Sequence, residues 1–224
     1  MEHADQLATS GQMAASIAHE IKNPTAGVLG ALKILREELY LEPDKIEIFD
    51  EMITQLERIN NTVNDLLSYA RPTSPEFTPV DLTEIMKKTI SLMSKTGNSA
   101  IIKTSFSDKN IIIEADKKQL QQVIWNVMLN AQDALDTGGE IILKLEDKDD
   151  FITITITDNG KGIPEKEIES VFKPFYSMKH KGTGLGMTIT KRIIEQHNGS
   201  IRIQSKVGTG TTVYITLPKL QKKV

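Results

Sequence analysis

The chain has 224 residues, which suits one or two domains, and its 39% hydrophobic and 25% charged residues are typical of a globular protein. The absence of cysteine excludes disulfides, thiolate metal sites and a cysteine nucleophile, and no apolar run approaches the ~18 residues that a membrane-spanning helix needs. The net charge of −3 and the 5% of aromatic residues disfavour a nucleic-acid surface, so we expect neither nucleic acid nor membrane contact for this chain.

The first predicted element is a long helix over residues 4–40. Two apolar heptad series run along it, and their members are Leu7, Ala14, Ile21, Val28 and Leu35, and Gly11, Ala18, Thr25, Leu32 and Leu39. A seam held for five heptads is typical of a helix that packs against another helix. Pro24 removes one backbone donor, so we expect a bend there.

A turn at residues 41–44 precedes a second predicted helix, which begins with Asp44 as N-cap and runs to about Ala70. Asn60 falls in its seam, where a buried polar residue would set the register. The two helices form an antiparallel hairpin that cannot bury both seams and its flanking apolar residues alone. We therefore expect a homodimer, in which two hairpins make a four-helix bundle.

Residues 72–76 are predicted to be a linker, because prolines and small polar residues interrupt the helical period. The net charge is −6 over residues 1–71 and +3 over the remainder. These changes divide the chain into a helical hairpin over residues 1–71, the linker, and a second domain over residues 77–224.

The second domain mixes helices and strands. Helices are predicted after the caps Asp81 and Asp116, ending near residues 95 and 135, and over residues 187–197 before Asn198 and Gly199. Strands are predicted over residues 101–106, 111–114, 141–145, 151–157, 201–205 and 211–217. This order predicts an α+β multidomain protein, whose second domain is an α/β sandwich with helices on one face of a mostly antiparallel sheet.

The first chemical candidate is His19. In the heptad frame it lies beside the seam and shares an exposed face with Asn23, one turn later. An exposed neutral imidazole is a competent nucleophile near neutral pH, and the adjacent Glu20 is placed to take its proton. The alternative is an ordinary solvated surface histidine.

Asn126, Asn130 and Asp133 lie at positions i, i+4 and i+7, and therefore on one face of the predicted helix. Three oxygen-bearing side chains beside a core stripe suit a hard divalent cation such as Mg²⁺, which also takes waters and phosphate oxygens. The alternative is the polar outer face of an amphipathic helix.

Two glycine-rich loops follow. Asp158 ends a strand and precedes Gly160 and Gly162, so its carboxylate can accept from an exocyclic amine. Gly182, Gly184 and Gly186 run directly into a helix, and such a loop can cradle phosphate with the help of the helix dipole. Neither loop has the spacing of a P-loop or a dinucleotide fingerprint, and each alone could be a simple turn.

The segment between the loops holds Phe172, Phe175, Tyr176 and Lys179. It is turn-like and basic, which predicts a mobile lid over an anion. The alternative is a surface loop that two core phenylalanines anchor.

Taken in order, these motifs resemble those of the sensor histidine kinases, most of all the sporulation-type kinases. The similar segments are the H-box at His19–Pro24, the N-box at residues 126–134, the glycine boxes at Asp158–Gly162 and Gly182–Gly186, the F-box at Phe172–Phe175, and the terminal strand at Gly208–Val213. The likeness extends from about residue 7 to Pro218. It implies a dimerisation and phosphotransfer hairpin of the HisKA type, followed by an ATP-binding domain of the Bergerat (GHKL) fold.

The resemblance also implies roles. His19 would be the phosphoacceptor, Glu20 would assist proton transfer, and Asn23 would position a water for dephosphorylation of the partner. Asn126 and Asn130 would hold Mg²⁺ on the ATP phosphates. The implied ATP-binding set is Asn126, Asn130, Asp133, Asp158, Gly160, Gly162, Ile163, Tyr176, Lys179, Gly182, Thr183, Gly184, Leu185 and Gly186.

Within this set Asp158 would bind the adenine amine, the lid glycines would act as hinges, and Lys179 would reach the γ-phosphate region. Two residues depart from the family pattern. Many members carry a basic residue where Asp133 stands, so Asp133 is expected to support a metal-bound water or the nucleotide. Thr25 replaces the leucine that is usual after the H-box proline, so packing near the bend is expected to be looser.

The implied activity is that of an ATP-dependent protein-histidine kinase in two-component signalling, which autophosphorylates His19 and passes the phosphoryl group to an aspartate of a response regulator. The implied partners are a second copy, the receiver domain of the regulator and a helical inhibitor protein. The implied location is the cytoplasmic side of a longer, membrane-anchored protein. The alternatives are another ATPase of the same fold, such as the gyrase or Hsp90 type or an anti-sigma serine kinase, and a non-catalytic dimeric scaffold.

Overall fold

The computed structural model describes residues 2–38, 43–71, 73–94, 100–106, 109–136, 138–179 and 182–221, without the side chains of residues 2–17, 19, 43 and 44. The chain divides into two compact units, Met1–Thr73 and Ser74–Val224, here the N-terminal and C-terminal units. Within the described residues, none of the helices has the length and apolar character needed to cross a membrane.

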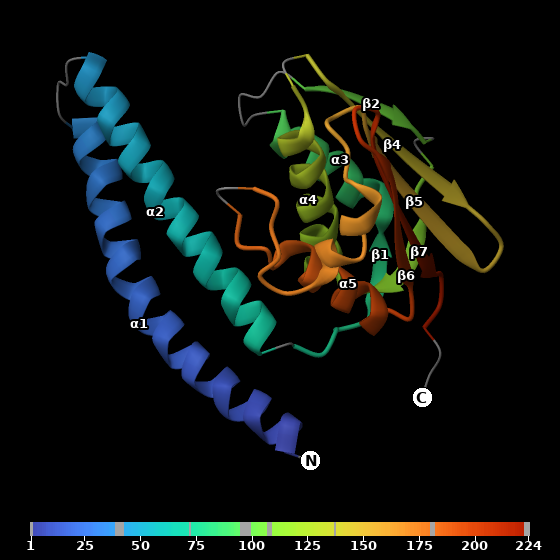
Figure 1. Cartoon of the computed structure of the whole chain (residues 1–224), viewed down its shortest axis with the longest axis horizontal. Coiled ribbons are helices and arrows are strands. Elements are labelled where there is room, and N and C mark those ends of the chain that lie inside the picture. The colour runs from blue at the N-terminus through green and yellow to red at the C-terminus, as the bar shows by residue number, and fades with distance from the viewer. Residues whose placement is uncertain are drawn as a thin grey trace. The chain divides into compact units, whose positions relative to one another are not determined.

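The N-terminal unit is a hairpin of α1 (Glu2–Glu38) and α2 (Pro43–Ala70) (Figure 1). Pro24 lies inside α1. One predicted heptad series of α1 faces α2, because Ala18, Thr25 and Leu32 are at most 8% exposed. Val63 of α2 is 5% exposed and packs in the same seam. The predicted helices and the seam between them are therefore present.

The other face of the hairpin is open. Ile21 and Val28, from the second heptad series of α1, are 40% and 51% exposed, and Ile59 of α2 is 43% exposed. The predicted N-cap at Asp44 is wrong, because α2 begins one residue earlier at Pro43, where a fixed φ and a missing N–H suit the first helical position. Asn60 is half-buried, and its Oδ1 is shielded from solvent.

The C-terminal unit is built on a five-stranded sheet with the strand order β2-β4-β5-β7-β6. Its strands are β2 (Ile101–Ser105), β4 (Glu140–Asp147), β5 (Phe151–Asp158), β6 (Ser200–Lys206) and β7 (Gly210–Pro218). Only the β2–β4 pair is parallel, which agrees with the predicted mostly antiparallel sheet. The register places Asp158, the last residue of β5, opposite Thr211 of β7.

A separate two-stranded sheet joins β1 (Thr78–Asp81) to β3 (Ile112–Ala115) in antiparallel pairing. Strand β1 was not predicted, because its four residues include Pro79 and follow directly on the linker pattern. The pairing fixes the first residues of the C-terminal unit against β3.

Three helices, α3 (Leu82–Met93), α4 (Lys117–Ala134) and α5 (Gly186–Gln196), cover one face of the sheet (Figure 1). The core between them and the sheet includes Leu120 and Ile124 of α4 and Ile154 of β5, all fully buried. Between β5 and α5 the described residues include two short 3₁₀ turns, Glu165–Glu167 and Ser170–Phe172. This fold confirms the predicted α/β sandwich.

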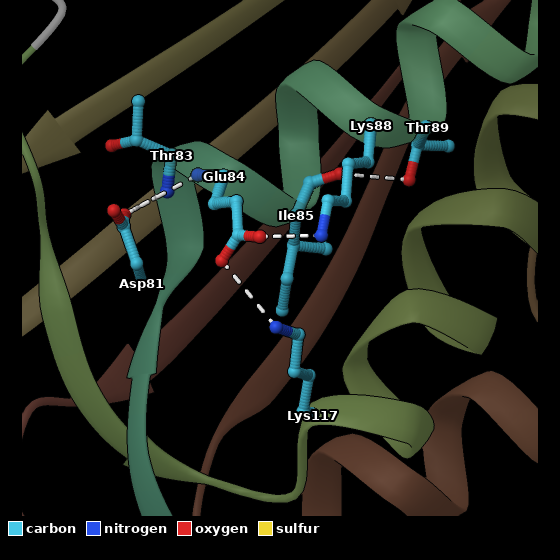
Figure 2. A network of polar contacts seen from close by, with 7 residues as sticks. All are labelled: Asp81, Thr83, Glu84, Ile85, Lys88, Thr89 and Lys117. Carbon is cyan, nitrogen blue, oxygen red and sulfur yellow. Dashed lines mark hydrogen bonds and ion pairs between the residues drawn. The ribbon is translucent and has the colours of Figure 1, made fainter.

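The start of α3 shows how local sequence sets the helix ends. Asp81 caps it by accepting from the backbone N–H groups of Thr83 and Glu84 at 2.9 and 3.3 Å (Figure 2). The Glu84 carboxylate then pairs with Lys88 one turn later, and with Lys117 at the first position of α4. Capping and charge pairing together therefore join the N-terminal ends of α3 and α4.

Candidate nucleotide-binding site

Asp158 is a carboxylate buried at the end of a strand. It is 6% exposed, and its Oδ1 accepts from the N–H of Gly160 at 2.9 Å and of Thr211 at 3.2 Å. Since both backbone bonds go to one oxygen, Oδ2 is left as the acceptor for a ligand amine. Burial raises the pKa of Asp158, and the two backbone donors oppose that rise.

The glycines beside Asp158 allow a close backbone approach. A Cβ on Gly160 would lie 2.3 Å from the carbonyl oxygen of Ala134, the last residue of α4. Any side chain there would push the loop away from the helix. Gly162 follows with a φ of +70°. The first glycine loop therefore holds the end of β5 against the end of α4.

Ser205 of β6 fastens the same loop from the other side, a role that none of the sequence motifs indicates. Its hydroxyl oxygen accepts from the N–H of Ile163 at 2.8 Å and donates to the carbonyl of Gly210 at 2.9 Å. Ser205 is one of several polar residues in β6, so its residue type does not distinguish it from the others. The contact depends on strand pairing between β6 and β7, which sequence spacing does not reveal.

The polar side chains on one face of α4 contact two other segments of the C-terminal unit. Asn126 donates through Nδ2 to the carbonyl of Gly186 at 3.2 Å and thus ties α4 to the first residue of α5. Asn130 and Asp133 both contact Lys179, whose ammonium donates to Asn130 Oδ1 at 2.7 Å and Asp133 Oδ2 at 2.8 Å. The predicted face exists, and its last two members share one cation.

The segment that carries Lys179 is called the lid below, and the name covers its described residues 173–179 and 182–185. Its Tyr176 hydroxyl donates to the Glu167 carboxylate, and this hydrogen bond raises the pKa of Tyr176. Phe175 is 64% exposed with a φ of 63°, so the alternative of two core phenylalanines as anchors is wrong for this residue. Phe175 is therefore not a core residue.

The C-terminal half of the lid depends on glycine. Gly184 has a φ of +68°, and a Cβ there would lie 2.5 Å from the carbonyl carbon of Phe175. Thr183 Oγ1 accepts from the N–H of Leu185 at 3.3 Å, and Leu185 is 2% exposed. Gly182 is exposed, and residues 180 and 181 lie outside the described part of the chain.

The predicted residues of the H-box belong to the N-terminal unit. Glu20 and Asn23 are exposed on α1, as the heptad frame predicts. The backbone of His19 is helical, but its side chain lies outside the described residues. In the described part of the chain, no group of three or more His, Cys, Asp or Glu side chains could hold a metal by itself.

Two protein-family models match the chain. Residues 9–75 match the His Kinase A (phospho-acceptor) domain, and residues 115–221 match the histidine kinase-, DNA gyrase B-, and HSP90-like ATPase. The phospho-acceptor match covers the hairpin, and the ATPase match covers the site around Asp158. The hairpin match distinguishes this chain from a protein that holds the ATPase domain alone.

Named relatives point the same way. Sporulation kinase C of Bacillus subtilis is 32% identical over 218 residues, which are 96% of this chain and 50% of the relative. The chain thus spans about half the length of that relative. The catalytic domain of histidine kinase ThkA is 30% identical, with a TM-score of 0.57, and the match covers 65% of this chain and 97% of that domain.

A longer solved structure, histidine kinase ThkA in complex with response regulator protein TrrA, matches 96% of this chain and 64% of that one, with 26% identity and a TM-score of 0.65. That match includes both units of the present chain. Phospho-acceptor and ATPase domains occur here in the order that the sequence motifs predicted. The chain therefore belongs to the sensor histidine kinases.

Proposed function

We propose that the C-terminal unit binds ATP and that His19 of the hairpin accepts its γ-phosphoryl group and passes it to an aspartate of a response regulator. The observation that carries the proposal is the geometry of Asp158, which lies in a domain of the histidine kinase ATPase family and has one carboxylate oxygen fixed by two backbone amides. The second oxygen accepts the exocyclic amine of adenine. Guanine would present a carbonyl oxygen there, which the carboxylate repels.

The loop around the base is shaped by Gly160 and Gly162, and Ile163 closes it through the Ser205 hydrogen bond. Asp158 is only 6% exposed, so an unmatched donor or acceptor beside it costs more than at the surface. The carboxylate therefore favours adenine nucleotides over guanine nucleotides.

The triphosphate lies along α4 in this proposal, with Mg²⁺ held by Asn126 and Asn130. The donor set fits, because amide oxygens are hard ligands and Asn130 Oδ1 already accepts from a cation. When bound, Mg²⁺ neutralises charge that develops on the phosphates during transfer. Tyr176, Lys179, Thr183 and Leu185 belong to the lid, for which Gly182, Gly184 and Gly186 act as hinges.

The N-terminal unit supplies the acceptor. An imidazole nitrogen of His19 attacks the γ-phosphorus, the bond to the β–γ bridging oxygen breaks, and ADP leaves. Glu20, exposed beside it on α1, takes the imidazole proton. Asn23 positions a water that hydrolyses the aspartyl phosphate of the regulator, which releases inorganic phosphate and the free aspartate. Residues 1–71 and 77–224 are the functional domains, and residues 72–76 let them reorient.

Assembly follows from burial. The open face of the hairpin exposes Ile21, Val28 and Ile59, so a second hairpin completes a four-helix bundle. The partner that receives the phosphoryl group is a receiver domain, which the ThkA–TrrA complex supports by analogy. A helical inhibitor protein and a membrane-anchored parent protein remain predictions of the family resemblance.

The test is incubation of the chain with γ-labelled ATP and Mg²⁺. Wild type should acquire an acid-labile label, and His19→Gln should lose it while binding nucleotide normally. His3→Gln, which removes another imidazole of α1, is the matched control and should keep the label. A receiver domain should then take up label from the wild-type chain.

Label that persists in His19→Gln would place the acceptor elsewhere. ATP turnover without any protein label would favour an ATPase of the same fold. Absence of nucleotide binding would favour the scaffold.

A further inference from the structure

One cation holds together two parts of the candidate site. Lys179 of the lid reaches across to α4, where its ammonium lies 2.7 Å from Asn130 Oδ1 and 2.8 Å from Asp133 Oδ2. The three residues are called the Lys179 bridge below. Lys179 is 46 residues from Asp133 and 49 residues from Asn130 along the chain, so the bridge is a tertiary contact and not a local turn.

The two oxygens of the bridge differ in what they offer. Asp133 brings a full negative charge, whereas Asn130 brings only an amide dipole, so the carboxylate supplies most of the attraction for the ammonium. The side chains of Lys179 and Asp133 are 31% and 44% exposed, so solvent screens the pair and it can open. The bridge is thus strong enough to bias the lid and weak enough to be exchanged.

The bridge also occupies an oxygen that the proposed function needs. Asn130 Oδ1 accepts from Lys179 in the structure, and the same atom is the proposed ligand for Mg²⁺. An ammonium and a metal ion at this one oxygen repel each other. Loading of the site therefore favours release of Lys179 from Asn130.

We propose that Asp133 is a positioning residue: in the nucleotide-free chain it holds the Lys179 ammonium on Asn130 as a placeholder cation, and so holds the lid on α4. When Mg²⁺ and nucleotide enter, Lys179 is released beside the phosphates, where a cation is needed. Only the second step, the release of Lys179 on nucleotide binding, rests on the proposed function. The proposal gives a role to Asp133, which stands where many family members carry a basic residue.

The first step is tested without nucleotide by hydrogen–deuterium exchange of the lid amides at residues 176–179. Asp133→Asn removes the charge but keeps the shape, and it should speed exchange about two- to fivefold, the range expected when a part-exposed ion pair is lost. Asp149→Asn, in the β4–β5 turn, is the matched control and should match wild type. Asp133→Glu should restore slow exchange.

Lys179→Met should also speed exchange, and the double variant with Asp133→Asn should be no faster than either single variant, because both remove the same contact. Exchange in Asp133→Asn equal to that of wild type, or effects that add in the double variant, would overturn the proposal. A failure of Asp133→Glu to restore slow exchange would also count against it.

The second step is tested by repeating the exchange with Mg²⁺ and ADP, with binding followed by calorimetry. The difference between wild type and Asp133→Asn should disappear on loading, because Lys179 then no longer contacts Asp133. A difference that persists in the loaded chain would overturn the placeholder role. If neither protein binds nucleotide, the proposed function fails, whereas the nucleotide-free result still decides whether Asp133 holds the lid.

Discussion

The two units of this chain bury their apolar residues to very different extents. In the C-terminal unit Leu120 and Ile154 are completely buried, whereas in the hairpin Val28 and Ile59 are 51% and 43% exposed. A sheet with helices on one face closes its own core, but two helices can bury only one seam. The comparison teaches that one unit closes its own core, whereas the other leaves apolar residues exposed that the proposed homodimer would cover.

The charged and ionisable side chains of the two units also differ in burial: none of those described in the hairpin is buried, whereas some in the C-terminal unit are. In the hairpin, Arg36 pairs with Asp50 on the outside, where both side chains remain more than 40% exposed. In the C-terminal unit, Asp158 and His197 are 6% and 0% exposed. Ionisable groups inside a core are costly, so they occur where partners or functions retain them.

The largest expected effect comes from breaking the closed core. Ile154→Ala removes three carbons from a fully buried site in β5 and should lower the free energy of unfolding of the C-terminal unit by about 2–5 kcal/mol. Denaturant unfolding followed by the signal of Trp125, which lies in α4, measures this change. The midpoint should not vary with protein concentration.

Ile59→Ala is the matched substitution in the hairpin. It should leave the Trp125 transition where it is and instead weaken self-association, measured as the dissociation constant in sedimentation experiments. If Ile59→Ala changed neither association nor hairpin stability, the open face would not be a dimer surface. If the core transition shifted with concentration, the C-terminal unit would not be complete alone.

The second prediction concerns the charge kept inside the C-terminal unit. Asp158→Asn replaces an acceptor by an amide and should weaken ADP binding about 10- to 100-fold, which corresponds to one lost hydrogen bond to a charged group. Asp50→Asn in the hairpin is the matched control and should bind ADP normally. Calorimetry measures both affinities.

Lowering the pH should have opposite effects on the stability of the nucleotide-free chain and on its affinity for ADP. Because burial raises the pKa of Asp158, its ionised form is disfavoured in the folded chain, and lowering the pH through the raised pKa stabilises the nucleotide-free fold. The same protonation removes the acceptor for adenine, so ADP binding should weaken over that pH range. Asp158→Asn should therefore abolish this pH dependence and be no less stable than wild type without nucleotide. Unchanged binding in Asp158→Asn would remove this carboxylate from the site.

Features set by neighbouring residues were predictable from the sequence. The caps Asp81 and Asp116 accept from the backbone N–H groups two and three positions later, so each cap is encoded within four residues. The β4–β5 pair was predicted because alternation and a polar turn are local signals. In the site, the motif glycines and Asp158 stood out for the same reason.

What the sequence did not reveal depends on contacts between distant segments. Strand β1 exists because β3 pairs with it, and its own four residues look like linker. Ser205 reaches Ile163 only after β6 and β7 pair, and Lys179 meets Asp133 only because the lid folds back on α4. The register of these contacts is a property of the assembled unit and not of any short motif.

The smallest expected effect concerns His197, which anchors the beginning of the C-terminal unit. The imidazole is fully buried, its Nε2 accepts from the N–H of Asp116 at 3.0 Å, and its Nδ1 donates to the carbonyl of Ile193 at 2.8 Å. The ring of Phe77, just before β1, packs edge-on against the imidazole, with 5.2 Å between the two ring centroids. The neutral imidazole satisfies both contacts, whereas a second ring proton would oppose the Asp116 N–H.

Burial lowers the pKa of His197. Just below the ordinary histidine pKa, the unfolded chain therefore binds a proton at His197, whereas the folded chain keeps the imidazole neutral. Stability is therefore complete above the ordinary histidine pKa of about 6.5 and should fall below it, by at most about 1.4 kcal/mol per pH unit. His197→Asn should be less stable at pH 7.5 but lose less between pH 7 and pH 5.5, measured as the difference from wild type in denaturant unfolding. His3→Gln should follow wild type, and equal slopes in wild type and His197→Asn would mean that the folded chain takes up the proton at His197 as readily as the unfolded chain does.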